Sequence, residues 1–144
     1  MNIQDAQAKT DAVAGLYKLF LEGDPSQIHD VLADDYEQIP PQTAETQPGI
    51  DNFMQGFMEG MGSMFSDIAG EVTHVLVDGD YVFVRGEYSA THTGEAWGIP
   101  ATGARVNFDA SDLHHVESGR ITKTWHLENF MSIYLQLQDA ASES

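Results

Sequence analysis

The spacing of hydrophobic residues predicts helices in the first half of the chain. Over residues 11–21 they recur at intervals of three and four, which is typical of an amphipathic helix with one buried face. Asp24 and Pro25 predict the start of a short second helix over 24–32, because Asp can cap free amides and Pro lacks an amide. A third helix is predicted over 50–65, although its three glycines each lower its intrinsic stability by roughly 1 kcal/mol.

The pattern changes in the second half, where β-branched and aromatic residues predict strands. Asp78 and Gly79 predict a tight hairpin turn, and Glu117 to Gly119 predict a second one. A polar tail follows the last amphipathic helix. The predicted elements are, in order, strands at 72–77, 81–90, 104–116 and 120–127 and a helix at 130–137.

Helices followed by long antiparallel strands predict an α+β fold in which the helices cover one face of a curved sheet and a pocket lies between them. Two consecutive prolines, Pro40 and Pro41, exclude regular helix around them and predict a loop at the pocket rim. A length of 144 residues fits one domain over 1–144, because the chain is too short for separate cofactor-binding and catalytic domains.

Composition mainly excludes partners and chemistries. A formal net charge of −17 disfavours nucleic acids and anionic membrane surfaces. The chain has no cysteine, so thiolate nucleophiles, disulfides and thiolate-bound metals are excluded. The first residues do not resemble a secretory signal and no apolar run could span a bilayer, so we expect a cytoplasmic protein.

Three stretches of the sequence resemble the SnoaL-like polyketide cyclases of the NTF2-like superfamily. They are VDGDYVFVR at 77–85, THTGEAWGIPATGARV at 91–106 and DLHHVESGRITKTWHLENF at 112–130. The resemblance implies a cone in which helices and a bent antiparallel sheet enclose a cavity for a small, mostly apolar ligand. It also implies an intramolecular aldol ring closure that needs neither a metal nor an organic cofactor.

The resemblance also indicates two site residues. In these cyclases one His and one Asp face the pocket from adjacent strands of the last hairpin, and the Asp acts as general acid and base. The matching positions here are Asp112 and His126, with the two residue types exchanged. We therefore transfer the positions to this chain without transferring the division of labour.

Whether Asp112 and His126 face each other depends on the hairpin turn. If Glu117, Ser118 and Gly119 form a three-residue loop, the two side chains share one face of the sheet. A two-residue loop would place them on opposite faces, because a register slip of one residue inverts every side chain. The assignment of the site therefore depends on which of these two loops forms.

A His and an Asp in an apolar pocket suit proton transfer next to a carbonyl. A histidine oriented by a carboxylate can act as a base near neutral pH. A carboxylic acid kept neutral by apolar surroundings can donate a hydrogen bond to the enolate oxygen. The alternative is that Asp112 and His126 form a purely structural pair in the sheet.

Other side chains are candidates for ligand contact or for structure. Gln38 lies in the loop before the prolines, and His92 either lines the cavity mouth or binds the loop backbone. His114 and His115 are adjacent on one strand, so at most one of them faces the pocket. Trp97 lies in a loop next to two glycines and could cover a ligand, whereas Trp125 is expected in the core. The expected ligand-binding residues are Tyr17, Gln38, Phe57, Met58, Tyr88, His92, Trp97, Phe108 and His114.

These observations leave three functions open. The first is a polyketide cyclase type of lyase or isomerase that acts on an apolar, carbonyl-containing small molecule. The second is a hydrolase or isomerase of the same fold acting on an epoxide or ester, and the third is a non-catalytic ligand-binding module. The six histidines lack helical metal-site spacings, so no metal is expected, and the family resemblance favours a homodimer.

Overall fold

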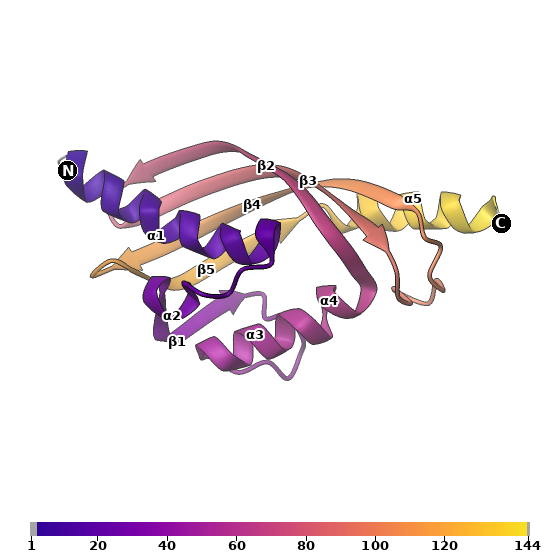
Figure 1. The fold of residues 1–144 in the computed structure, drawn as a ribbon, viewed down its shortest axis with the longest axis horizontal. Helices are drawn as coiled ribbons and strands as arrows, with labels where there is room; N and C mark the ends of the chain where they lie inside the picture. The colour runs from indigo at the N-terminus through magenta and orange to yellow at the C-terminus, as the bar shows by residue number, and fades with distance from the viewer. Residues whose placement is uncertain (1–2, 144) are drawn as a thin grey trace.

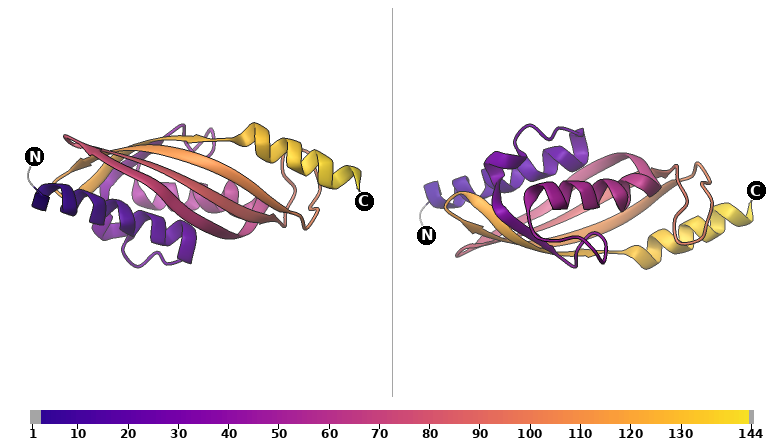
Figure 2. Two further views of the ribbon diagram at one scale, coloured as in Figure 1. Left: turned by 90° about the horizontal axis from the view of Figure 1, so that it is seen from above. Right: turned by 90° about the horizontal axis from the view of Figure 1, so that it is seen from below.

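The computed structural model describes residues 3–143. It confirms the α+β class: helices pack on a five-stranded mixed sheet (Figures 1 and 2). The expected domain also includes residues 1, 2 and 144, which lie outside the described range. The elements are α1 (Ile3–Glu22), α2 (Ile28–Val31), β1 (Leu32–Ile39), α3 (Ile50–Glu59), α4 (Met61–Met64), β2 (Phe65–Asp78), β3 (Tyr81–His92), β4 (Arg105–Glu117), β5 (Arg120–Glu128) and α5 (Phe130–Ser142).

The sheet has the strand order β1-β5-β4-β3-β2. Strands β2 to β5 form antiparallel pairs, and β1 pairs in parallel with β5. The sequence pattern missed β1, because only Leu32 and Tyr36 are fully buried in this strand and acidic residues separate them. An edge strand that pairs with a segment distant in the sequence has little local sequence signal.

The first helix is longer than its apolar stripe indicated, and the second is shorter. α1 buries Leu16 and Tyr17 against the sheet and ends before Gly23, whose φ of 66° suits glycine. Asp24 accepts a hydrogen bond from the Ser26 amide in a local turn instead of starting a helix, so α2 has only four residues. The predicted 24–32 helix therefore starts four residues too early, whereas its end is correct to within one residue.

The predicted helix over 50–65 divides into two. Gly60 leaves the helical conformation at φ −83° and ψ −96°, so α3 ends there and the short α4 follows. The chain then enters β2 at Phe65, seven residues before the predicted strand start. Gly70 allows this early part of β2 to lie close to β3, because a Cβ atom at Gly70 would come within 2.2 Å of the Glu87 carbonyl oxygen.

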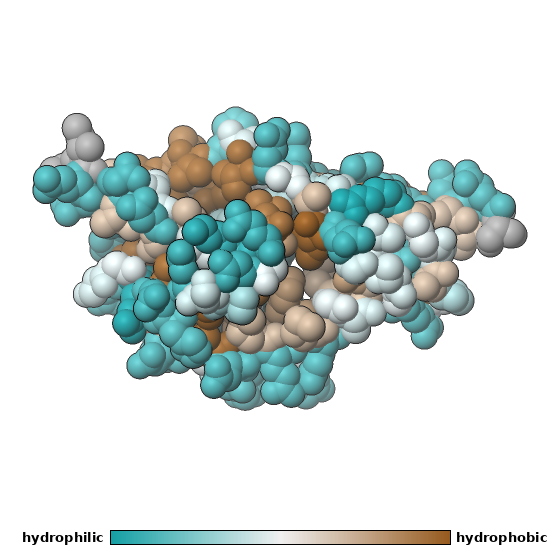
Figure 3. Space-filling model, viewed as in Figure 1, coloured by the Kyte–Doolittle hydropathy of each residue, from teal (hydrophilic) through white to brown (hydrophobic). Residues whose placement is uncertain are grey.

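Two hydrophobic clusters flank the centre of the molecule. The first joins α1, α2 and α3 to the sheet, and the second joins α5 and the 93–104 loop to β2, β3 and β4. Near the centre of the view in Figure 3 the surface is hollowed, and hydrophobic residues gather there between more polar surroundings. None of the helices described in residues 3–143 is long and apolar enough to cross a membrane.

Candidate active site

The last hairpin places charged side chains on the inner face of the sheet. Asp112 on β4 pairs directly with His126 on β5, so both side chains point to the same side. Of the two loop lengths that the sequence left open, the structure has the two-residue loop, because Glu117 pairs with Arg120 and Ser118 and Gly119 form the turn. Both turn residues have positive φ, as the tightest hairpin turns require.

A bulge explains why a two-residue turn still brings the pair together. The register shifts by one residue where His115 pairs with Lys123 and Val116 pairs with Ile121, so Thr122 is the extra residue. One extra residue inverts the alternation of every residue that follows it on β5. Without the bulge, His126 would face away from Asp112.

The inner face of this hairpin closes one side of a cavity of about 280 Å³. Its walls are mostly aromatic and aliphatic, and the loop with Pro40 and Pro41 contributes to them as predicted. The lining residues are Leu16, Tyr17, Phe20, Tyr36, Gln38, Pro40, Pro41, Gln42, Phe57, Met61, Ile68, Tyr88, Phe108, Ala110, Asp112, His114, Thr124, His126, Glu128 and Phe130. The volume is just below the range of roughly 300–1,000 Å³ that is typical of small-molecule pockets.

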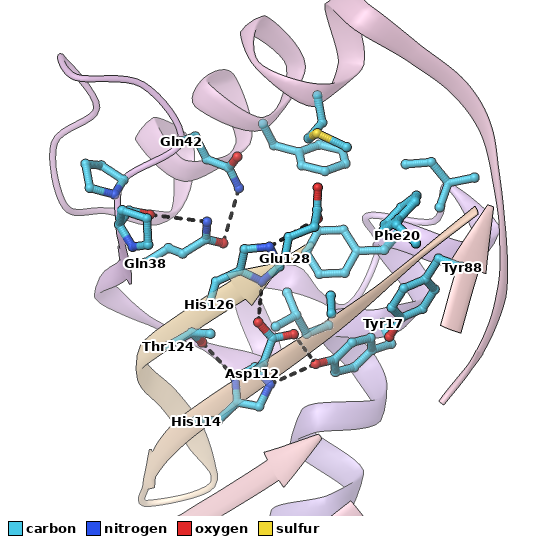
Figure 4. A pocket seen from close by; sticks show the side chains of 18 of the residues that line it. Tyr17, Phe20, Gln38, Gln42, Tyr88, Asp112, His114, Thr124, His126 and Glu128 are labelled. Atoms are coloured by element: carbon cyan, nitrogen blue, oxygen red, sulfur yellow. Dashed lines mark hydrogen bonds and ion pairs between the residues drawn. The ribbon is translucent and has the colours of Figure 1, made fainter. Parts of the chain in front are cut away.

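His126 lies between two carboxylates, as Figure 4 shows. Its Nδ1 is 2.5 Å from Asp112 Oδ1, and its Nε2 is 3.2 Å from Glu128 Oε1. The side chains of Asp112 and Glu128 are only 9% and 7% exposed. Both ring nitrogens of His126 therefore have an anionic partner that is shielded from water.

Behind this pair a second set of hydrogen bonds leads away from Asp112 (Figure 4). The Tyr17 hydroxyl donates to Asp112 Oδ2 at 2.5 Å and lies 3.0 Å from His114 Nε2. His114 Nδ1 is 2.7 Å from Thr124 Oγ1. Since the Tyr17 proton is used by Asp112, we assign the His114 proton to Nε2, where it donates to Tyr17, while Thr124 donates to Nδ1.

The surroundings separate the protonation states of Asp112 and His126. Burial tends to raise the pKa of Asp112, but the hydrogen bond and positive charge of His126 outweigh it, and the pKa lies below its ordinary value. Burial tends to lower the pKa of His126, but the hydrogen bonds and charges of Asp112 and Glu128 raise it to about 10. At neutral pH the pair is therefore a carboxylate and an imidazolium, the reverse of the neutral acid and neutral base considered from the sequence.

His114 is a different kind of histidine. It is fully buried, and burial lowers its pKa to about 4. It is therefore neutral at physiological pH and can orient Tyr17 without adding charge. Its neighbour His115 lies on the outer face, where it contacts Thr122 and the Tyr81 ring, as the alternation of β4 predicted.

The structure brings most of the expected ligand-binding residues to the cavity and leaves three outside its lining. The residues that line it are Tyr17, Gln38, Phe57, Tyr88, Phe108 and His114. Met58 is 61% exposed on the far side of α3, and His92 is fully buried with its Nδ1 bonded to Thr102. Trp97 packs against Phe130, which itself lines the cavity.

Trp125 does not lie where it was expected, and Glu128 is a site residue that the sequence analysis missed. Trp125 is 39% exposed on the outer face, next to Tyr81, and is not in the core. Glu128 was not among the candidates, although it lies two residues after His126 on the same strand and therefore on the same face. Once His126 is placed in the cavity, this alternation is enough to find Glu128.

No metal centre is apparent in the part of the chain that the structure describes. Within residues 3–143, no group of three or more His, Asp or Glu side chains is arranged to hold a metal ion. The acidic and imidazole groups of the cavity are instead satisfied mainly by one another.

A sequence profile of the SnoaL-like polyketide cyclases matches residues 10–137. The chain belongs to this family. The bent sheet and its helices accordingly form the NTF2-like fold of that family. No protein of curated function shows significant similarity to the sequence.

Solved structures share this fold over nearly the whole chain. TsrD from Streptomyces laurentii is 23% identical with a TM-score of 0.77, and the match covers 95% of this chain and 97% of TsrD. IdmH from Streptomyces antibioticus, a proposed polyketide cyclase, is 26% identical with a TM-score of 0.77 and coverages of 90% and 98%. A proposed polyketide cyclase from Acidithiobacillus ferrooxidans is 19% identical with a TM-score of 0.80 and coverages of 97% and 99%.

Proposed function

We propose that this protein catalyses a polyketide cyclase type of proton-transfer reaction, without a cofactor, on an apolar small molecule that contains carbonyl groups. The observation that supports this most is the ion pair of Asp112 and His126, which faces an enclosed, mostly apolar cavity. A charged acid and a charged base in a water-poor site interact strongly with developing charge. The family of the chain agrees with this chemistry.

The protonation states assign a role to each partner. The Asp112 carboxylate removes a proton from a carbon next to a carbonyl, and the positive charge of the His126 imidazolium stabilises the enolate that forms beside it. The enolate carbon then forms a bond to a further carbonyl carbon of the same molecule, and the resulting alkoxide takes the proton from Asp112. One C–H bond and the π bond of that carbonyl break, one C–C bond and one O–H bond form, and no oxidant or reductant is needed.

The low pKa of Asp112 restricts the substrate. A carboxylate with a lowered pKa is a weak base, so it can deprotonate only a carbon that is already acidic. A carbon between two carbonyl groups meets this condition. Tyr17 donates to Asp112 in the resting state and holds the carboxylate in place for the transfer.

Variants of the pair test the proposal. Asp112→Asn and His126→Asn should each lower ring closure of a 1,3-diketone or β-ketoester that carries a further carbonyl group about 10²- to 10⁴-fold, because each removes one partner in proton transfer. His115→Asn is the matched control, since His115 lies on the outer face of the same hairpin. Full activity in both site variants would overturn the assignment of these residues.

Hydrolysis of an ester or epoxide by the same pair is separated by isotope labelling. Ring closure transfers no oxygen from water, so product formed in ¹⁸O-labelled water should carry no label in newly formed bonds. Incorporation of one labelled oxygen per turnover would replace ring closure by hydrolysis. Binding of the diketone with no turnover of any such compound would support a non-catalytic binding module.

We also propose that the protein forms a homodimer through the outer face of the sheet. Leu113, Trp125 and Leu127 expose 37%, 39% and 73% of their surfaces there. A contiguous group of exposed large apolar side chains is typical of a surface that another protein covers. A second copy of the chain presents the same face, so a symmetric pair would cover both.

A further inference from the structure

Glu128 has a carboxylate oxygen that no group within residues 3–143 satisfies. Its Oε1 accepts the hydrogen bond from His126 Nε2, whereas Oε2 is buried and has no hydrogen-bond partner. In the described part of the chain only one other buried side-chain atom, Nε2 of His92, lacks a partner. The Glu128 side chain is 7% exposed and lines the cavity, whereas His92 is not part of the lining.

The hydrogen-bond donors near Glu128 Oε2 form hydrogen bonds with other acceptors. In the cavity wall, the Gln42 amide donates to Gln38 Oε1, and the Gln38 amide donates to the Pro40 carbonyl. Both His126 nitrogens face other carboxylate oxygens, and Tyr17 donates to Asp112. Figure 4 shows one oxygen of Glu128 pointing away from His126 into the space near Gln42 and Phe20. Each Gln amide nitrogen has a second hydrogen, but none of these groups is hydrogen-bonded to Oε2, so a group bound in the cavity can supply the donor that Oε2 lacks.

We propose that Glu128 is a substrate-binding residue, and that its Oε2 accepts a hydrogen bond from a hydroxyl group of the ligand. The ligand class is then an apolar, aromatic or enolic compound with a free hydroxyl in addition to its carbonyl groups. A buried acceptor without a donor costs about 1–3 kcal/mol, and a ligand hydroxyl removes this cost. The inference rests on the proposed function, because it takes the same cavity as the substrate site.

The cavity favours a hydroxyl over charged donors. Its lining contains no Lys or Arg, and Asp112 and Glu128 lie on the two sides of the single imidazolium of His126. A ligand carboxylate would be repelled by Glu128. A ligand ammonium carries three donors, of which the single free acceptor oxygen would satisfy one, and the mostly apolar wall would leave the others without partners.

Pairs of probes that differ only in this hydroxyl test the inference without turnover. Phenol, 1-naphthol and 1-hydroxyanthraquinone are each titrated by calorimetry against the corresponding methyl ether. The wild-type protein should bind the hydroxyl member of at least one pair about tenfold or more tightly, because hydrogen bonds to charged acceptors are among the stronger ones. In Glu128→Gln the amide nitrogen can occupy the Oε2 position, so this preference should disappear or reverse.

Two controls separate binding from folding and from catalysis. Glu128→Gln keeps an oxygen that can accept from His126, and a thermal melt checks that it folds. Glu117→Gln, at the exposed end of the same hairpin, should keep the wild-type preference. Turnover of diketones with no hydroxyl preference would overturn this inference alone, and a preference without turnover would overturn only the proposed function.

If no hydroxyl compound of the series binds more tightly than its ether, Glu128 does not bind a ligand hydroxyl. An unchanged preference in Glu128→Gln would lead to the same conclusion, because another acceptor would then be responsible.

Discussion

Apolar side chains are usually buried and charged ones exposed, but part of the β4–β5 hairpin shows the opposite arrangement on its two faces. The inner face buries Asp112 and His114 and partly buries His126, whereas the outer face exposes Leu113 and Trp125. These residues alternate along the same two strands, so they share backbone geometry and differ only in the side to which they point. The comparison shows that burial of charge at this site is local to the cavity and is made possible by mutual pairing.

The two faces also differ in what destabilises the folded protein. On the inner face, each charged group depends on its partner, because water cannot replace a lost interaction there. On the outer face, lost hydrogen bonds can be replaced by water, and the unfavourable feature is exposed apolar surface. The same substitution should therefore have different effects on the two faces.

The largest effect is expected when one member of the inner ion pair is removed. Asp112→Ala leaves the His126 imidazolium and the Tyr17 hydroxyl without their acceptor, and should lower the free energy of unfolding by about 3–5 kcal/mol. Urea denaturation measures this change. Glu117→Ala, at the exposed end of β4, should stay within about 0.5 kcal/mol of wild type. A similar small change for Asp112→Ala would show that the inner pair is not stabilising.

The second effect is a maximum of stability near pH 6.5. The folded pKa of His126 is about 10 against roughly 6.5 unfolded, so its contribution is full below pH 6.5 and is lost as the pH rises to 10. The folded pKa of His114 is about 4, so between pH 6.5 and 4 the unfolded state binds more protons and stability falls. The lowered pKa of Asp112 adds to this loss at acid pH.

Urea denaturation across pH 4 to 10 checks this profile. His126→Asn should remove much of the decline between pH 7 and 10, whereas His29→Asn, on the exposed surface of α2, should not. Stability that increases from pH 7 to 9 in the wild-type protein would contradict the assigned state of His126.

A third, smaller effect concerns the outer face. Trp125→Glu places a charge in the proposed dimer surface and should weaken self-association about tenfold or more, which corresponds to about 1.4 kcal/mol. Sedimentation equilibrium measures it. Leu135→Glu is the control, because Leu135 is 55% exposed on α5 and is not part of the β4–β5 hairpin. A wild-type monomer at high micromolar concentration would refute the outer-face dimer.

The smallest effect compares two matched His–Thr pairs. Thr124→Val removes the hydroxyl bonded to buried His114, and should cost about 1–2 kcal/mol because the ring nitrogen loses its donor in a dry site. Thr122→Val removes the partner of His115 on the outer face, where water can take its place, and should cost less than about 1 kcal/mol. Thermal unfolding of both variants compares them, and equal costs would show that the two faces do not differ in solvation.

Much of the helical and hairpin order was predictable, because it depends on local pattern. The apolar spacing that includes Leu16 and Tyr17 identified α1, and the turns after β2 and β4 were found to within one residue. β1 was missed, because it is stabilised by parallel pairing with β5 at a distance of many residues. The split at Gly60 was missed too, because three glycines in a helical pattern do not indicate which one ends the helix.

The candidate site was predictable in part for the same reason. Asp112 and His126 followed from resemblance and strand alternation, but the expectation that a two-residue loop would separate them was wrong, because the Thr122 bulge restores their pairing. Bulges have no reliable local sequence signal. The protonation states could not follow from sequence, because they depend on burial and on Glu128, which contacts His126 only in the folded hairpin.

The sequence by itself determined the family, the α+β class and the presence of a His and an Asp on the last hairpin, because each of these depends on residues close together in the chain. Only the tertiary structure decided which face of that hairpin is buried. Alternation makes two faces distinct without saying which one is inside, and here the inside is the charged one. Packing of α1 and the proline loop over Asp112 and His126 removes water from them. Burial alone would favour their neutral forms, but the pairing of His126 with Asp112 and Glu128 outweighs it and keeps Asp112 and His126 charged.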